Sequence, residues 1–175
     1  AREVADRLGA VDLLVNNAAD QTLAALSEAT PEYWMRMLAV DVVAAAELTR
    51  LVVADHPDRR RLCVVNVSSV EGLVPFRNHA AYAAAKSALQ SFTAAAAVEY
   101  APARVCAVAP GLVDRPGLAQ DWPQGFEWWC RTSPSGRPVT AEEVAAVVGW
   151  LASATGVSGV TVPVDGGWSA SARQS

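Results

Sequence analysis

The chain has 175 residues, of which 52% are apolar and 18% are charged, and its formal net charge is −4. This composition predicts a single domain (residues 1–175) with enough apolar material for a sizeable core, and it excludes a disordered protein. It also argues against a nucleic-acid-binding surface, which requires clustered Lys and Arg. A membrane-spanning helix is not predicted, because the sequence has no run of 18 uncharged apolar residues.

Helix-like and strand-like segments alternate along the chain. Short apolar runs predict strands over 11–15, 62–67, 104–109 and 159–164. Helical patterns with start or stop signals predict helices over 2–8, 31–54, 80–100 and 141–153. Residues 112–139, rich in Pro, Gly and Trp, are expected to be irregular. Together these elements predict an α/β fold, a doubly wound parallel sheet with helices on both faces.

The three cysteines show no spacing typical of a metal site or a disulfide framework. Cys63 and Cys106 lie in apolar runs, where a free thiol behaves as a small hydrophobic group, and Cys130 stands alone. No metal site is therefore predicted. A reducing cytoplasm is the expected location, since no secretory signal pattern is present.

Tyr82 and Lys86 are the first candidates for chemistry, because a spacing of four residues places them on one face of the 80–100 helix. A cation beside a tyrosine favours the phenolate and is expected to lower its pKa, which suits proton transfer to an alkoxide. Ser69 follows the 62–67 strand, at the edge where ligands bind in doubly wound sheets. An ordinary surface pair is the alternative reading of Tyr82 and Lys86 taken alone.

The composition of basic residues favours the chemical reading. Thirteen of the 14 basic residues are Arg, and Lys86 is the only Lys, a bias typical of a high-GC bacterium. Arg differs from Lys in shape and cannot release its proton in a protein, so an ammonium group has a specific use at this position. Small residues on both sides of Tyr82 also leave room for a bulky ligand.

Five segments in order resemble the short-chain dehydrogenase/reductase family. They are LLVNNAA (13–19), VVNVSS with the following glycine (64–72), YAAAK (82–86), APG (109–111) and VDGGW (164–168). The resemblance covers essentially the whole chain. It implies a Rossmann-like fold and an NAD(P)-dependent oxidoreductase that moves a hydride between NAD or NADP and a small-molecule carbonyl or alcohol substrate.

The resemblance also implies roles for single residues. Tyr82 would be the acid/base, Lys86 would lower its pKa and bind the nicotinamide ribose, and Ser69 would hold the substrate carbonyl. The implied cofactor contacts further include the following residues: Asn16, which would brace its strand, Ala18, near the adenosine part, and Pro110, Gly111 and Val113, beside the nicotinamide.

Three departures from the family pattern qualify these expectations. The family's glycine-rich TGxxxGxG loop and first βαβ unit have no match in this sequence, so the chain is expected to be part of a gene product of roughly 250 residues. By itself the chain is expected to be inactive and unable to bind NAD(H). The 11–15 strand is then expected at an edge of the sheet. Asp41 stands where the family has the Asn of a proton relay, and it could pair with Lys86. Arg115 replaces a cofactor-binding Thr and is expected to point to solvent beside Asp114.

The tryptophans of the 112–139 segment bear on the substrate. Trp122, Trp128 and Trp129 in a lid region favour a bulky, apolar substrate, whereas the alternative is that these rings cover the core or an oligomer interface. Small apolar residues over 40–53 and 83–98 predict a homodimer or homotetramer built on those helices. Two other functions stay open: a catalytically silent homologue with a regulatory or scaffold role, and a non-redox epimerase or dehydratase.

Overall fold

A four-stranded parallel sheet forms the centre of the computed structural model, which describes residues 3–4, 7 and 9–171. The strands lie in the order β1 (Leu13–Asn16), β2 (Cys63–Val67), β3 (Arg104–Pro110) and β4 (Thr161–Val164), each hydrogen-bonded to the next. The predicted parallel sheet is confirmed, each strand lies within two residues of its predicted bounds, and β1 is at an edge. The helix predicted over 2–8 lies mostly outside the described residues.

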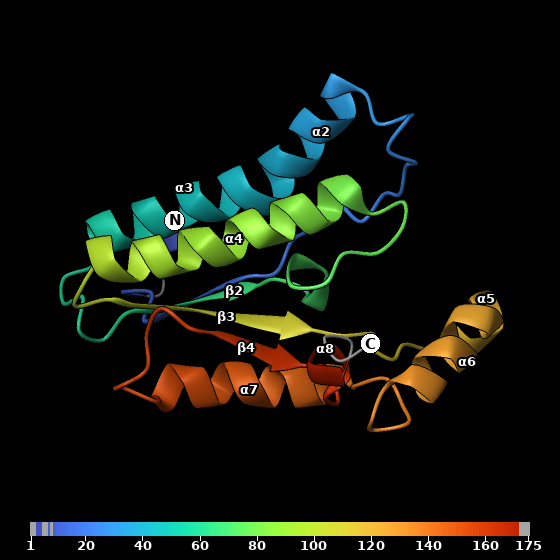
Figure 1. Ribbon diagram of the computed structural model, residues 1–175. Coiled ribbons are helices and arrows are strands. Elements are labelled where there is room, and N and C mark those ends of the chain that lie inside the picture. Colours follow the sequence, from blue (N-terminus) through green and yellow to red (C-terminus); the bar gives the residue numbers. More distant parts are fainter. Residues whose placement is uncertain (1–2, 5–6, 8, 172–175) are drawn as a thin grey trace.

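Helices cover both faces of the sheet, as Figure 1 shows. The helices α3 (Ala44–Asp55) and α4 (Ala80–Glu99) lie on one face, and α7 (Ala141–Ser153) lies on the other. The capping box of α7 forms as predicted, because Thr140 and Glu143 each accept a hydrogen bond from the other's backbone N–H. This layering confirms the doubly wound fold class.

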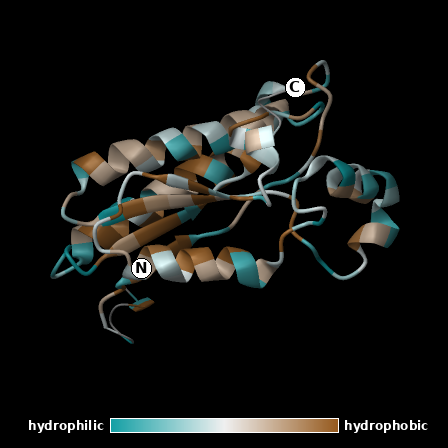
Figure 2. Cartoon of the chain, turned by 60° about the horizontal axis from the view of Figure 1, so that its bottom comes forward, coloured by the Kyte–Doolittle hydropathy of each residue, from teal (hydrophilic) through white to brown (hydrophobic). Residues whose placement is uncertain are grey.

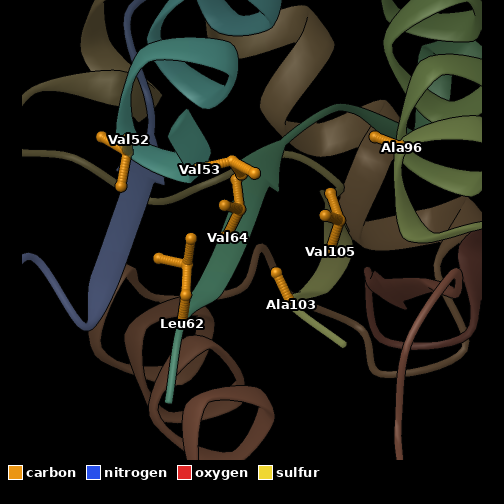
Figure 3. Close-up of a cluster of buried hydrophobic side chains, with 7 residues drawn as sticks. All are labelled: Val52, Val53, Leu62, Val64, Ala96, Ala103 and Val105. Carbon is orange, nitrogen blue, oxygen red and sulfur yellow. The ribbon is translucent and has the colours of Figure 1, made fainter. Parts of the chain in front are cut away.

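Two apolar clusters hold the layers together. On the α3–α4 side, the buried residues Val52, Val53, Leu62, Val64, Ala96, Ala103 and Val105 form one cluster (Figure 3). On the α7 side, Cys63 and Cys106 are fully buried with Leu151 and two strand valines. The central strands β2 and β3 therefore bury both faces, whereas β1 and β4 are partly exposed, and the strands are largely brown in Figure 2.

The helix predicted over 31–54 is confirmed, but it contains a π-helical turn. It consists of α2 (Pro31–Leu38), a π-helical turn η1 (Ala39–Val43) and α3. Nothing in the sequence of η1 marks the change, since it contains no Pro or Gly. Asp41 is the buried residue of this turn, and π-helical turns often occur at functional sites.

The prediction of an irregular 112–139 segment is wrong over part of its length. It contains two short helices, α5 (Leu118–Asp121) and α6 (Pro123–Thr132). Pro123 begins α6, a position where its missing N–H and fixed φ are favourable, and Trp129 anchors the helix in a buried position. Both helices lie beyond the carboxyl ends of the strands (Figure 1).

Arg104 ties the sheet to the end of α7. Its buried guanidinium donates hydrogen bonds to the carbonyl oxygens of Leu151 (2.6 Å), Ala152 (2.6 Å) and Ala154 (3.2 Å). These carbonyls belong to the last helical turn, where no partner exists within the helix. A buried cation on the first residue of β3 thus takes the place of a C-terminal cap.

Replacing Arg104 with Met is expected to lower the free energy of unfolding by about 3 kcal/mol, because charged hydrogen bonds to buried groups are lost. Urea unfolding followed by circular dichroism measures the change. Arg61→Met is the matched control, since Arg61 pairs with Asp12 on the surface and its loss should cost roughly 0.2–1 kcal/mol. Equal unfolding midpoints for the two variants would contradict this role of Arg104.

Candidate active site

A cavity of about 1000 Å³ opens beyond the carboxyl ends of β2 and β3. Its walls come from segments far apart in the chain: the turns after β2 and β3, the start of α4, and the α5–α6 region. Four of the residues predicted from sequence line it, namely Ser69, Tyr82, Gly111 and Val113. Parallel strands of this kind place ligands at their carboxyl ends, so the cavity is the candidate active site.

Ser69 and Tyr82 meet in this cavity. Ser69 follows β2 and accepts a hydrogen bond on Oγ from the backbone N–H of Glu71 at 3.1 Å, while Tyr82 lies in the first turn of α4. Burial raises the pKa of Tyr82 to about 12, although hydrogen bonds with the Ser69 and Gln21 side chains act to lower it. Loss of solvation thus outweighs the favourable contacts, and the lowering of this pKa by Lys86 stays a prediction.

Lys86 lies behind Tyr82 and is almost fully buried, at 1% exposure. Its Nζ donates a hydrogen bond to the Val67 carbonyl oxygen at 3.1 Å and lies 5.4 Å from the centre of the Tyr82 ring. Burial lowers the pKa of Lys86, whereas the carboxylate of Asp41 acts to raise it. The only lysine of the chain thus lies in the interior, against the tyrosine.

Asp41 is the partner of Lys86, with Oδ1 3.6 Å from Nζ. The same oxygen accepts a hydrogen bond from the backbone N–H of Asp20 at 3.1 Å. Burial raises the pKa of Asp41, and the Lys86 ammonium acts to lower it. Asp41 Oδ2 is buried without a hydrogen-bond partner among the described residues, so this carboxylate keeps an acceptor free at the site.

Asn16 braces the sheet below the site. Its side-chain Nδ2 donates to Asn66 Oδ1 at 2.8 Å, and Asn66 in turn donates to Thr93 Oγ1 at 2.9 Å, which links β1, β2 and α4. All three side chains are buried. Ala18 is exposed, two residues after the end of β1. The structure thus places Asn16 in a buried series of side-chain hydrogen bonds, and Ala18 on the surface two residues further along.

Gly111 closes the cavity on the β3 side, directly after Pro110. Its N–H donates to the Val164 carbonyl oxygen at 2.9 Å, and a Cβ atom there would lie 2.6 Å from the Trp129 ring. Only glycine permits this approach. Val113 bridges to Val139, so the chain stays extended on leaving the sheet.

Arg115 points to solvent, as expected, but its partner is not Asp114. Its guanidinium forms an ion pair with Asp121 at 2.6 Å, and both side chains are more than half exposed. An exposed pair of this kind contributes little to stability. Arg115 is thus paired with the last residue of α5, at the rim of the cavity that it helps to line.

Aromatic rings make the remaining wall of the cavity. Trp129 stacks on Trp168, with ring centres 5.2 Å apart, and Phe76 and Trp128 contact the same pair. Trp129 is 3% exposed, whereas Trp122 is 49% exposed at the cavity. Trp129 therefore covers the core, as the alternative interpretation has it, and Trp122 presents an apolar ring to the cavity; a bulky, apolar substrate stays a prediction.

Among the cavity residues that were not predicted from sequence, Gln21, Glu71 and His79 carry polar side chains close to Ser69 and Tyr82. Glu71 Oε2 and His79 Nδ1 lie 2.7 Å apart. Burial raises the pKa of Glu71, and His79 acts to lower it. Their positions in the sequence could have indicated them, because Glu71 stands two residues after Ser69 and His79 three residues before Tyr82.

The site has donors that suit a nucleoside ribose. Lys86 Nζ donates one hydrogen bond to Val67 and is paired with Asp41, which leaves one of its three N–H groups beside Tyr82 as a donor that ribose hydroxyls can accept. A glycine-rich phosphate loop is not found in the part of the chain that the structure describes. The residues present therefore fit the nicotinamide-ribose end of NAD(H) or NADP(H).

Two negative findings concern residues 3–4, 7 and 9–171 alone. No group of three or more His, Cys, Asp or Glu side chains is placed to hold a metal ion there. Nor is any of their helices both long enough and apolar enough to span a bilayer.

Comparison with known sequences gives consistent matches. The family model described as enoyl-(acyl carrier protein) reductase matches residues 1–169. A meso-2,3-butanediol dehydrogenase from Serratia marcescens is 34% identical over 177 residues, covering 98% of this chain and 70% of that protein. A cyclopentanol dehydrogenase from Comamonas testosteroni is 38% identical over 171 residues, covering 94% and 67%. The chain thus spans about two thirds of the length of these relatives.

Solved structures agree with the sequence matches. A gluconate 5-dehydrogenase from Burkholderia cenocepacia, in complex with NADP and tartrate, superposes with a TM-score of 0.86 at 27% identity. It matches 97% of this chain and 69% of its own. A short-chain dehydrogenase/reductase family oxidoreductase from Burkholderia thailandensis superposes with a TM-score of 0.87 at 32% identity, over 97% of this chain and 68% of its own.

Proposed function

The chain belongs to the short-chain dehydrogenase/reductase family, and on that premise we propose that its complete gene product is a cytoplasmic enzyme that moves a hydride between NAD or NADP and an alcohol or carbonyl compound. Tyr82 is the proposed acid/base. The observation that carries the proposal is the buried hydroxyl of Tyr82, which contacts Ser69 in the cavity and has Lys86 behind it. The dehydrogenase names of the relatives support the reaction class.

In the proposed reaction, the bound nicotinamide supplies or accepts the hydride. The hydroxyls of Ser69 and Tyr82 hold the substrate oxygen, and Tyr82 donates its proton to that oxygen as it becomes an alkoxide. A pKa of about 12 keeps Tyr82 protonated at neutral pH, so the group is ready for carbonyl reduction. Alcohol oxidation is the reverse step and requires Tyr82 as the phenolate, which takes the proton from the alcohol, so oxidation is favoured at higher pH.

Lys86 and Asp41 are proposed to position and tune this centre. The Lys86 ammonium binds ribose hydroxyls, and Val67 and Asp41 hold it in place from behind. Asp41 takes the position of the family's relay Asn, and its unpartnered Oδ2 provides an acceptor for a proton path. Asn16, Ala18, Pro110, Gly111 and Val113 are proposed cofactor contacts.

The cavity favours a small-molecule substrate with an apolar body. A volume of about 1000 Å³ and the rings of Trp122, Trp128 and Phe76 suit an aliphatic ring or chain. The enzyme acts on small molecules in this proposal, with no nucleic-acid partner.

The test is an oxidation and reduction assay on the complete gene product with cyclopentanol and cyclopentanone, followed by nicotinamide absorbance. We expect saturable, cofactor-dependent change in both directions. Calorimetric titration with NADH and NADPH separates the two alternatives. A silent homologue binds neither cofactor, whereas an epimerase or dehydratase binds cofactor without a net change in absorbance.

The protein is also proposed to form a homodimer or homotetramer through α3 and α4. Small residues on the outer face of α4, Ala94 and Ala95 among them, are exposed, as are the apolar side chains of Val43, Leu48 and Val98. Small residues allow two helices to approach closely, and a twofold axis brings the same face of each copy together.

Replacing Ala95 with Glu is expected to convert the assembly to monomers, because it places a buried charge in the centre of this interface. Light scattering at tens of micromolar measures the mass. Ala145→Glu is the control, since Ala145 is exposed on α7, on the opposite face of the sheet. A wild-type protein that is already monomeric would refute the proposed interface.

A further inference from the structure

Glu71 and His79 form a polar pair in the cavity for which the proposed chemistry has no use. Glu71 lies in η2 (Val70–Gly72), the turn that follows Ser69, and His79 is the residue before α4. Glu71 Oε2 and His79 Nδ1 are 2.7 Å apart, and their side chains are 13% and 24% exposed. Both residues line the same cavity as Tyr82.

The pair has a fixed position relative to the reacting groups. The backbone N–H of Glu71 donates a hydrogen bond to Ser69 Oγ at 3.1 Å. This bond fixes the backbone that carries the Glu71 carboxylate relative to Ser69. His79 accepts a hydrogen bond on its carbonyl oxygen from the N–H of Ala83 in the first turn of α4, beside Tyr82. A substrate oxygen held by Ser69 and Tyr82 therefore brings its neighbouring atoms to Glu71 and His79.

Both groups retain unsatisfied hydrogen-bonding capacity. Glu71 Oε2 and His79 Nδ1 are buried and face each other at 2.7 Å, and neither makes a hydrogen bond to any other described residue. The second carboxylate oxygen of Glu71 and Nε2 of His79 also have no hydrogen-bond partner among the described residues, so they remain for a ligand. Leaving buried polar atoms in this state costs free energy. A ligand that hydrogen-bonds to the pair recovers that cost.

The apolar surroundings restrict what that ligand group can be. Phe76 lies beside His79 with ring centres 6.0 Å apart, and Phe76 itself packs on Trp128 and Trp168. In an aromatic pocket, a few polar groups orient the ligand. A carboxylate ligand would meet the Glu71 carboxylate and be repelled, whereas a hydroxyl can donate to Glu71 and accept from His79 at once.

We propose that Glu71 and His79 bind a second hydroxyl of the substrate, next to the reacting carbon. The preferred substrates are vicinal diols and the corresponding hydroxy ketones, with an aliphatic body against the aromatic wall. This inference rests on the proposed oxidoreductase function and names its substrate class.

The test compares cis-cyclohexane-1,2-diol with cyclohexanol, which differ only in the second hydroxyl. In the complete gene product we expect kcat/KM for the diol to exceed that for cyclohexanol about tenfold, the effect of roughly one good hydrogen bond. Glu71→Met and His79→Phe each bring this ratio close to one by raising KM for the diol. The kcat/KM of His79→Phe for cyclohexanol stays within about threefold of wild type, because cyclohexanol has no group for the pair. Glu71→Met also removes a charge that acts to raise the pKa of Tyr82, so it is judged by the ratio of the two alcohols alone.

Arg77→Gln is the matched control, because Arg77 lines the same cavity and is exposed. This substitution should leave the ratio of the two kcat/KM values unchanged. A role confined to structure would lower kcat/KM for both alcohols equally. That result, or a diol preference that survives in both pair variants, overturns the inference.

Binding distinguishes a failure of this inference from a failure of the proposed function. Quenching of tryptophan fluorescence reports occupancy directly, because Trp122, Trp128 and Trp129 line the cavity. Tighter binding of the diol than of cyclohexanol, lost in Glu71→Met, supports the pair's role even if no hydride transfer occurs. Equal binding of the two alcohols to the wild-type protein overturns it, whatever the redox activity.

Discussion

Replacing Tyr82 with Phe is expected to reduce turnover by roughly 10²–10⁴-fold, the range in which positioned acid–base groups contribute. Phe keeps the ring that lies against Lys86 and loses only the hydroxyl in contact with Ser69. NADH affinity, measured by calorimetry, should change little, since the tyrosine oxygen is the single group removed. The loss should therefore fall on kcat, with KM nearly unchanged.

Tyr33→Phe is the matched control for this variant. The Tyr33 hydroxyl donates to the Thr22 carbonyl oxygen at 2.7 Å on the surface, so its removal tests loss of a phenol outside the cavity. Normal turnover in Tyr82→Phe would remove Tyr82 from the role of acid/base. A loss of equal size in Tyr33→Phe would show that the effect is structural.

Replacing Lys86 with Arg is expected to lower kcat/KM by about 10²-fold, although the positive charge remains. The ammonium lies in a fully buried site between the Val67 carbonyl oxygen and Asp41, and a planar guanidinium has a different shape and donor geometry. Displacement of a positioning group by about 1 Å is enough for a loss of this size. Steady-state kinetics measures it.

Two further variants separate charge from packing at Lys86. Lys86→Met keeps a linear chain of similar length without charge, so it tests the ammonium alone. Arg36→Lys, at an exposed ion pair with Asp20, tests an exchange of the two cations on the surface and should leave activity unchanged. Wild-type turnover in Lys86→Arg would show that the unique lysine of this chain has no chemical significance.

Local sequence patterns were sufficient to predict the sheet and most of its helices. Apolar runs bounded by turn residues predict strands well when the strands are buried on both faces, as β2 and β3 are. The Thr140–Glu143 capping box fixes the start of α7 because both of its hydrogen bonds are local. Spacing on one helix face also predicts that Tyr82 and Lys86 converge on one site.

Features that depend on tertiary contacts were not predictable in this way. The π-helical turn at Asp41 has no local sequence signal, and the pKa of Tyr82 is governed by burial that only the folded chain creates. Helix α6 was missed because its stability comes from Trp129 packing on Trp168, far along the chain. Glu71 and His79 come together across a loop, so neither residue marks the other in sequence.

The π-helical turn also fixes the rotational phase of the residues before it. Each residue of an α-helix turns the chain by roughly 100°, and a π turn accommodates one residue more than an α turn. Met37, fully buried in α2, and Asp41, buried in η1, both depend on that extra residue for their orientation. A one-residue deletion within 39–43 would restore an unbroken α-helix and rotate Met37 out of the core, so apart from Asp41 this segment is expected to tolerate substitution better than a change of length.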